Sequence, residues 1–293
     1  MNALKRNSKL ETTYFPTKDV FDASILKDKF DIILLWQNNE FGMPKEIIGI
    51  QDLDIPVLAD VCDPQDAHDA IKFHKKWKID HYFHYYPETL FHELFPKNFK
   101  YNTIIFGLEP SLYQNEKPFK DRIQNKILNS GAVGNTKFLS RIINSIRNPK
   151  WNSYKYYTLR TKCNNLPYVD YTTTLEHDYV GDRYPLLLQK YAAAIAATSV
   201  ETTIKYWEIP AAGCLTFMEI TKKNKGDYLG YVDNETSIFI NEDNYQNKFE
   251  EFLNNPDDPK WEKIADAGRK YAINNFNNDK ACNSLVNLME TMI

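Results

Sequence analysis

The stretch that decides the fold is SVETTIKYWEIPAAG, residues 199–213. Thr202 or Thr203 can cap the start of a helix, and Gly213 can end it in a left-handed conformation. The stretch therefore predicts a helix over residues 205–212. Lys205 and Glu208 stand three positions apart, so they project from one face of that helix.

The chemistry of Lys205 and Glu208 suits a nucleoside diphosphate. A helix N-terminus presents backbone N–H groups and a partial positive charge to an anion, and a lysine there adds a full charge. A carboxylate one turn further along can accept two hydrogen bonds from the cis-diol of a ribose. The other interpretation is a solvated ion pair on a surface helix, and local chemistry alone leaves both open.

A second candidate for phosphate binding is the run SGAVG at residues 130–134. It lies at a predicted strand-to-helix turn, where glycines let backbone amides approach a phosphate closely. Arg141, in the helix predicted over residues 136–147, is a candidate for a second phosphate contact. The run is neither a GxGxxG nor a Walker loop, so by itself it is weak evidence.

Apolar runs and amphipathic stretches alternate along the whole chain, which predicts βαβ units and a parallel sheet. Strands are predicted at 31–36, 55–59, 79–83, 101–106, 127–128, 155–159, 215–217 and 237–240, with residues 10–15 as a leftover edge strand. Helices are predicted at 66–77, 136–147, 184–191 and 205–212, with three more in the last fifty residues. The polar stretch 114–121 is the predicted linker between two domains.

The donor-site pattern resembles that of GT-B glycosyltransferases, whose C-terminal domain is of the glycosyl transferase group 1 or family 4 type. Their donor-site helix has a basic residue, an aromatic residue and then Glu-x-x-Ala-x-Gly, which residues 205–213 approach. Residues 129–132, 184–199 and 264–271 resemble neighbouring segments of that domain, so the resemblance covers about residues 122–292.

The resemblance implies an α/β protein of the GT-B class, with two Rossmann-like domains facing a cleft and a reduced N-terminal domain. The expected acceptor domain is 1–117, the nucleotide-sugar domain is 118–275, and 276–293 is a closing C-terminal helix.

The same resemblance implies roles for single residues. Glu208 would hold the donor ribose, Lys205 the diphosphate, and Ser130 with Gly131 the phosphate loop; Ser199 and Tyr206 complete the expected donor site beside Arg141. Two positions depart from the family pattern. Val200 stands where retaining members with paired glutamates have a carboxylate, with Glu201 one position away, and Pro210 predicts a short or kinked helix.

The N-terminal half offers candidates for the catalytic base. Asp60 lies at a predicted strand end, and His81 and His84 lie in the next strand, so with Glu201 they form the candidate catalytic set. A histidine with a near-neutral pKa suits the abstraction of a proton from a sugar hydroxyl, although strand-end Asp and His residues often only cap loops. No carboxylate or cysteine set completes a zinc site around these histidines. Metal independence is expected on the premise that the chain has no Asp-x-Asp motif to hold a divalent metal on the diphosphate.

The expected function is metal-independent, cofactor-free transfer of a hexose or pentose from a nucleotide sugar to a hydroxyl of a glycan, lipid or other acceptor. A retaining course is slightly favoured. The alternatives are an epimerase-like enzyme and a non-catalytic binding module on the same fold.

Composition and net charge bear on the partners and the cellular location expected for the chain. A net charge of −3 and a pI near 6.1 argue against a nucleic-acid partner. Four scattered cysteines predict free thiols, and residues 1–10 lack the apolar core of a signal peptide. The expected location is cytoplasmic, with peripheral membrane contact and the oligomeric state left open.

Overall fold

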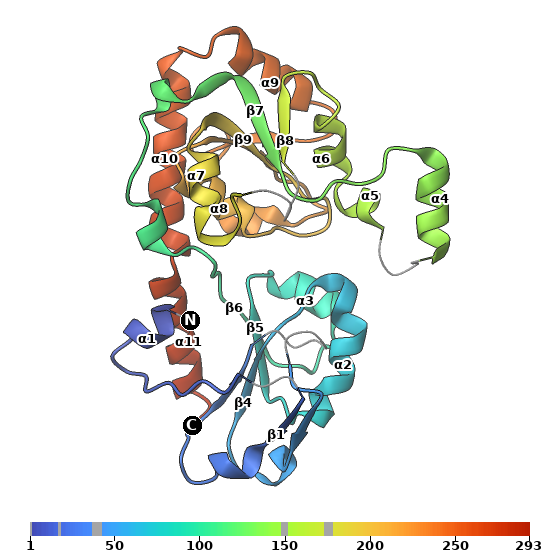
Figure 1. The fold of residues 1–293 in the computed structure, drawn as a ribbon, viewed down its shortest axis with the longest axis vertical. Helices are drawn as coiled ribbons and strands as arrows, with labels where there is room; N and C mark the ends of the chain where they lie inside the picture. The colour runs from blue at the N-terminus through green and yellow to red at the C-terminus, as the bar shows by residue number, and fades with distance from the viewer. Residues whose placement is uncertain (1, 17–18, 37–42, 148–151, 173–177) are drawn as a thin grey trace. The chain divides into compact units, whose positions relative to one another are not determined.

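The computed structural model describes residues 2–16, 19–36, 43–147, 152–172 and 178–293 (Figure 1). The chain forms two compact units. Unit 1 comprises Met1–Phe106 with Asn278–Ile293, and unit 2 comprises Gly107–Asn277. Within the described residues, no helix is both long and apolar enough to cross a membrane.

Unit 1 is built on a four-stranded parallel sheet in the order β2 (Ile33–Leu35), β4 (Val57–Asp60), β5 (His81–His84), β6 (Tyr101–Thr103). All four residues of β4 are buried, because a central strand of a parallel sheet is covered on both faces. Val57 and Ala59 face one apolar core, while Leu58 between them faces the other. Further elements are β1 (Val20–Asp22), β3 (Glu46–Ile48), α1 (Asn2–Arg6), α2 (Ala67–Lys76), α3 (Glu88–Leu94) and α11 (Asn278–Glu290).

Unit 2 is built on a five-stranded parallel sheet in the order β11 (Ile238–Ile240), β10 (Leu215–Glu219), β9 (Tyr191–Ala196), β7 (Ile123–Ser130), β8 (Val169–Thr172). The strand order reverses between β7 and β9, and open α/β sheets bind ligands at the carboxyl edge of such a switch point. The helices of this unit are α4 (Phe138–Arg147), α5 (Ser153–Tyr156), α6 (Thr158–Cys163), α7 (Tyr184–Leu188), α8 (Lys205–Ala211), α9 (Tyr245–Asn254) and α10 (Pro259–Phe276).

Short 3-10 helices join several of these elements. They are η1 (Ala23–Leu26), η2 (Ile50–Asp52), η3 (Pro64–Asp66), η4 (Pro110–Tyr113), η5 (Phe119–Asp121), η6 (Gly181–Arg183) and η7 (Gly226–Leu229).

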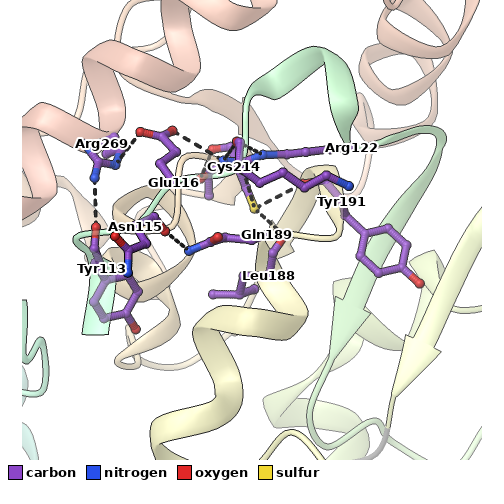
Figure 2. Close-up of polar contacts among 11 residues, drawn as sticks. Tyr113, Asn115, Glu116, Arg122, Leu188, Gln189, Tyr191, Cys214 and Arg269 are labelled. Carbon is purple, nitrogen blue, oxygen red and sulfur yellow. Dashed lines mark hydrogen bonds and ion pairs between the residues drawn. The ribbon is translucent and has the colours of Figure 1, made fainter. Parts of the chain in front are cut away.

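A charge network around the buried Arg122 fixes the segment that leads into β7 (Figure 2). Glu116 accepts from Arg122 at 3.3 Å through one carboxylate oxygen and from Arg269 of α10 at 3.0 Å through the other. Arg269 also donates to the carbonyl of Tyr113 at 2.8 Å, and Arg122 donates twice to the carbonyl of Lys117. Because the Arg122 side chain is fully buried, the carboxylate and the carbonyl together compensate its lost hydration.

Most predicted elements are present, and two strand predictions are wrong. Residues 155–159 form parts of α5 and α6, because Asn152 caps α5 by accepting from the backbone N–H of Lys155 at 3.1 Å. The strand of this region is β8, further along the chain. Residues 10–15 form no strand, and β1 lies later, at Val20–Asp22. The helix that holds Pro210 is short, as predicted, with seven residues.

The boundaries of the two compact units differ from the expected domain boundaries at residues 117 and 275. The boundaries lie after Phe106 and after Asn277, so the segment 107–117 is part of unit 2. Helix α11 belongs to unit 1, because its Leu285 and Val286 pack with Leu58 and Phe83 of that sheet.

Gly213 is a position where the charge network demands glycine. Its φ is +76°, and a Cβ there would overlap the Glu116 carboxylate and lie 2.8 Å from Arg122 Nη2. We expect Gly213→Ala to lower the free energy of unfolding by about 2–4 kcal/mol, measured by urea denaturation. Gly181→Ala is the matched control, since Gly181 has a φ of +58° and nothing within 4 Å of the added carbon. Equal losses of unfolding free energy in Gly213→Ala and Gly181→Ala would show that backbone strain alone causes the destabilisation.

Candidate active site

In the turn after β7, the cationic side chains of Lys205 and Arg160 come close to the backbone of Gly131. Gly131 has a φ of +100°, and its N–H donates to Thr172 of β8 at 3.0 Å. A Cβ at this position would overlap the ammonium of Lys205 and lie 3.1 Å from Nη1 of Arg160. The absence of a side chain therefore lets both cations reach the backbone at the carboxyl edge of β7.

Lys205 is the first residue of α8 and reaches back to the turn. Its Nζ donates to the carbonyl of Ser130 at 2.6 Å and lies 3.4 Å from the Ser130 hydroxyl. That hydroxyl also shares a hydrogen bond of 2.6 Å with Tyr184 of α7. Burial, together with the neighbouring Arg160, lowers the pKa of Lys205 to about 7 against the opposing effect of Glu208. Lys205 is thus buried beside a second cation, and both effects disfavour its charged form.

Arg160 of α6 is the second cation, and the sequence analysis did not select it. Its side chain is buried, at 3% exposure, and Nη1 donates to the carbonyl of Ala132 at 3.1 Å. Nε and Nη2 are buried and have no hydrogen-bond partner among the described residues. A buried guanidinium with two unsatisfied nitrogens is costly, so this side chain is suited to an anion that completes its hydrogen bonds.

Glu208 lies one turn along α8 from Lys205. Burial raises the pKa of its carboxyl to about 7, against the opposing effects of Lys205 and of a hydrogen bond with Tyr113. The same contact and burial raise the pKa of the Tyr113 hydroxyl well above its usual value. Because Arg269 holds the Tyr113 carbonyl, the charge network of Figure 2 positions the hydroxyl that faces Glu208.

The loop between β9 and α8 is held by a buried hydrogen-bond network. Tyr206 is fully buried, and its hydroxyl accepts from the N–H of Thr198 at 3.1 Å and donates to the carbonyl of Glu219 at 3.0 Å. The amide nitrogen of Asn224 donates to Thr198, Tyr206 and Glu219. The structure therefore places Tyr206 beneath the loop, where its hydroxyl is occupied by protein partners.

Three further polar side chains are buried near this loop. Ser199 is 2% exposed and its N–H donates to the carbonyl of Tyr156, and Glu201 is 9% exposed. Glu219, which the sequence analysis did not select, ends β10 and is 4% exposed. Burial raises the pKa of Glu219 to about 7, against Lys223, Arg160 and a contact with Ser199. The one feature of the sequence that could have pointed to Glu219 is its position at the end of a strand.

Arg141 lies apart from these groups, although it was expected at the phosphate. Its guanidinium stacks over the ring of Tyr154 at 4.1 Å, and Nη2 donates to the carbonyl of Thr136 at 3.3 Å. Arg160, rather than Arg141, is the arginine beside Gly131.

Unit 1 brings together two of the candidate catalytic residues. His84 ends β5 and Asp60 ends β4, and the His84 Nδ1 lies 2.7 Å from Asp60 Oδ1 with both side chains buried. The His84 Nε2 has no hydrogen-bond partner among the described residues. His81 lies at the opposite end of β5, where it contacts Asn102 at 2.7 Å and where burial lowers its pKa. An Asp-x-Asp sequence does occur in this unit, at residues 52–54.

The buried Glu208 carboxyl predicts a pH dependence of stability. Folding raises its pKa from 4.5 to about 7. Between these values the folded chain holds a proton that the unfolded chain has lost, so the free energy of unfolding falls as pH rises and the contribution is gone above the folded pKa. We expect a slope of about 1 kcal/mol per pH unit, near the limit of about 1.4 kcal/mol that linkage sets for one proton held only by the folded chain.

Glu208→Gln should make the stability profile less steep between about pH 5 and pH 7, with Glu219 keeping its own contribution, measured by urea denaturation at a series of pH values. Glu235→Gln, which changes an exposed loop residue of the same unit, is the control and should keep the wild-type slope. An unchanged slope in Glu208→Gln would assign the pH dependence to another group, such as Glu219.

Comparisons with known proteins identify the fold. No protein-family model matches the sequence, and neither does any curated protein. A glycosyltransferase from Rickettsia africae ESF-5 is 12% identical with a TM-score of 0.55, covering 92% of this chain and 79% of that one. Sucrose-phosphate synthase from Thermosynechococcus elongatus is 11% identical with a TM-score of 0.54, covering 83% and 69%.

A third similar structure contains a nucleotide sugar. HepE from Anabaena, solved in complex with UDP-glucose, is 10% identical with a TM-score of 0.55, covering 81% of this chain and 72% of that one. At these identities the likeness concerns the fold, and it agrees with the two parallel sheets described above. The chain therefore has the GT-B fold, with two Rossmann-like α/β units.

Proposed function

We propose that this protein is a glycosyltransferase that moves a sugar from a nucleotide-diphosphate sugar to a hydroxyl acceptor. The observation that carries the proposal is the pair of cations, Lys205 and Arg160, that converge on Gly131 at the topological switch point of unit 2. The shared fold supports it, since HepE binds UDP-glucose in the structure that resembles this one.

Each group has a role that follows from its chemistry. Arg160 offers the diphosphate the two nitrogens that none of the described residues binds, and Lys205 offers a second positive charge 2.6 Å from the carbonyl of Ser130. Anion binding would favour the charged ammonium and so raise the pKa of Lys205 from about 7. Both cations then stabilise the charge that develops on the departing nucleoside diphosphate. Glu208 accepts the ribose hydroxyls, held in place by Tyr113.

The transfer as proposed needs no metal, because the two cations supply the positive charge at the leaving group. It also needs no cofactor beyond the nucleotide sugar. The sugar could be a hexose or a pentose, and the acceptor a glycan, a lipid or another hydroxyl compound.

Arg160→Met tests the donor site through two measurements, the Tm of the ligand-free protein and the affinity for the donor. Because the variant removes a buried charge with unsatisfied nitrogens, we expect the Tm of the ligand-free protein to stay level or rise. The stabilisation by UDP-, GDP-, ADP- or dTDP-sugars should fall, with affinity for the best donor weakened about 10- to 100-fold. Thermal shift gives the first readout and isothermal calorimetry the second.

Lys162→Met is the matched control, because Lys162 lies on the same helix and its ammonium pairs with Glu242 on the surface. It should bind the donor as the wild type does. If no nucleotide sugar raises the Tm of the wild type at millimolar concentration, the proposed function fails. A Tm loss in Arg160→Met with unchanged donor affinity would instead make Arg160 a structural residue.

Whether the reaction retains or inverts the anomeric configuration decides which of the remaining candidate residues acts in catalysis. A retaining reaction, which we favour slightly, requires no base on the acceptor and gives Glu201 or Glu219 a place beside the sugar. An inverting reaction requires a base, and the Asp60–His84 pair provides one, since Asp60 holds Nδ1 and leaves Nε2 for a hydroxyl proton.

The test is the anomeric configuration of the product by NMR, together with the rate of His84→Gln. A retained configuration with a rate within about threefold of wild type is expected, because general base catalysis contributes about 100-fold or more where it operates. An inverted configuration with a loss of that size would assign the base to His84. His81→Gln, at the other end of the strand, serves as the control.

A further inference from the structure

Helix α4 presents an apolar face to solvent. It follows the Gly131 turn and lies at the side of unit 2, away from the sheet (Figure 1). Five large apolar side chains on it are exposed, and at 100° per residue they occupy one arc of about 140°. They are Phe138 at 69%, Leu139 at 73%, Ile142 at 42%, Ile143 at 47% and Ile146 at 76% exposure.

The base of this helix is fixed to the unit. Arg141 stacks on Tyr154 of α5, and the N–H of Gly134 donates to the Thr161 hydroxyl of α6 at 2.7 Å. Gly134 also packs so closely on the backbone of Tyr154 that a Cβ could not be accommodated there. Since one side of α4 is held by these contacts, the exposed apolar face is a defined surface of the unit.

The stretch of sequence that contains α4 is basic and has no acidic residue. From residue 122 to residue 169 the sequence has nine Lys or Arg residues and no Asp or Glu, in a chain whose net charge is −3. Lys137, Arg141 and Arg147 lie in or directly before the helix. An apolar face flanked by basic residues is the pattern of a helix that lies in the surface of an anionic bilayer.

We propose that α4 is a membrane-surface anchor that docks unit 2 on anionic lipid. Its ten residues span about 15 Å, too short to cross a bilayer, so the helix lies in the plane of the interface. The apolar arc enters the acyl boundary, and exposed basic residues beside it such as Lys137 meet lipid phosphates, each contributing about 1 kcal/mol near the surface.

Charge also argues against a second copy of the chain on this face. Apposed α4 helices would bring two acid-free basic segments together, with no carboxylate between residues 122 and 169 to neutralise them. The proposal concerns binding alone and stands whether or not the chain transfers sugars.

Vesicle flotation with the full chain tests the proposal. Wild type should bind vesicles of phosphatidylcholine with about a third phosphatidylglycerol, bind phosphatidylcholine alone weakly, and release at about 0.5 M NaCl. Leu139→Glu with Ile146→Glu should weaken binding about tenfold or more, because both side chains leave the acyl boundary. Lys137→Gln with Arg147→Gln should weaken binding to anionic vesicles only.

Val232→Glu is the matched control, an exposed apolar residue of unit 2 at 46% exposure, and should bind as the wild type does. Unchanged far-UV circular dichroism and Tm establish that each variant folds. Absence of wild-type binding, or equal binding by the Leu139 and Ile146 variant, would overturn the proposal. A concentration-dependent dimer by sedimentation that this variant abolishes, without vesicle binding, would assign the face to a second copy instead.

Discussion

The convergence of Lys205 and Arg160 on Gly131 is the constraint around which unit 2 is organised. Three elements meet there: the turn after β7, the first residue of α8 and the buried arginine of α6. Like charges repel, and burial lowers the pKa of both cations. The protein nevertheless holds them together with carbonyl acceptors on Ser130 and Ala132, which satisfy hydrogen bonds without cancelling charge. A site of this kind is stabilised by an anion that arrives from solution.

Sequence reasoning located the elements of this site because each has a local signal. The left-handed Gly213 at the end of the helix and the SGAVG turn follow from glycine chemistry, which acts within a few residues. The predicted cap by Thr202 or Thr203 is wrong, because Ile204 occupies the N-cap position and makes no side-chain cap hydrogen bond. The parallel strands follow from continuous apolar runs. The fold could therefore be predicted in outline, including the short helix that contains Pro210.

The remaining features depend on long-range packing, which leaves no local trace. Arg160 was missed because residues 155–159 were predicted as a strand, whereas an Asn152 cap makes the region helical and turns Arg160 inward. Arg141 was chosen from its distance to the glycines along the chain, and its stacking on Tyr154 could not be foreseen. The apolar periodicity of α4 predicts a helix equally well whether its face packs on a core or meets solvent. Only the structure shows that this face is exposed.

The distribution of acidic residues connects the inside of unit 2 with its surface. Between residues 122 and 169, the segment that contains both Arg160 and α4, the sequence has no carboxylate at all. Inside the unit, a carboxylate beside Arg160 would occupy the two nitrogens that have no partner in the described part of the chain, and would compete with any phosphate. On the surface, a carboxylate on α4 would repel the same kind of group in a lipid headgroup. One compositional constraint would thus serve both proposed anion-binding surfaces, a buried one formed by hydrogen-bond donors and an exposed one formed by apolar and basic side chains.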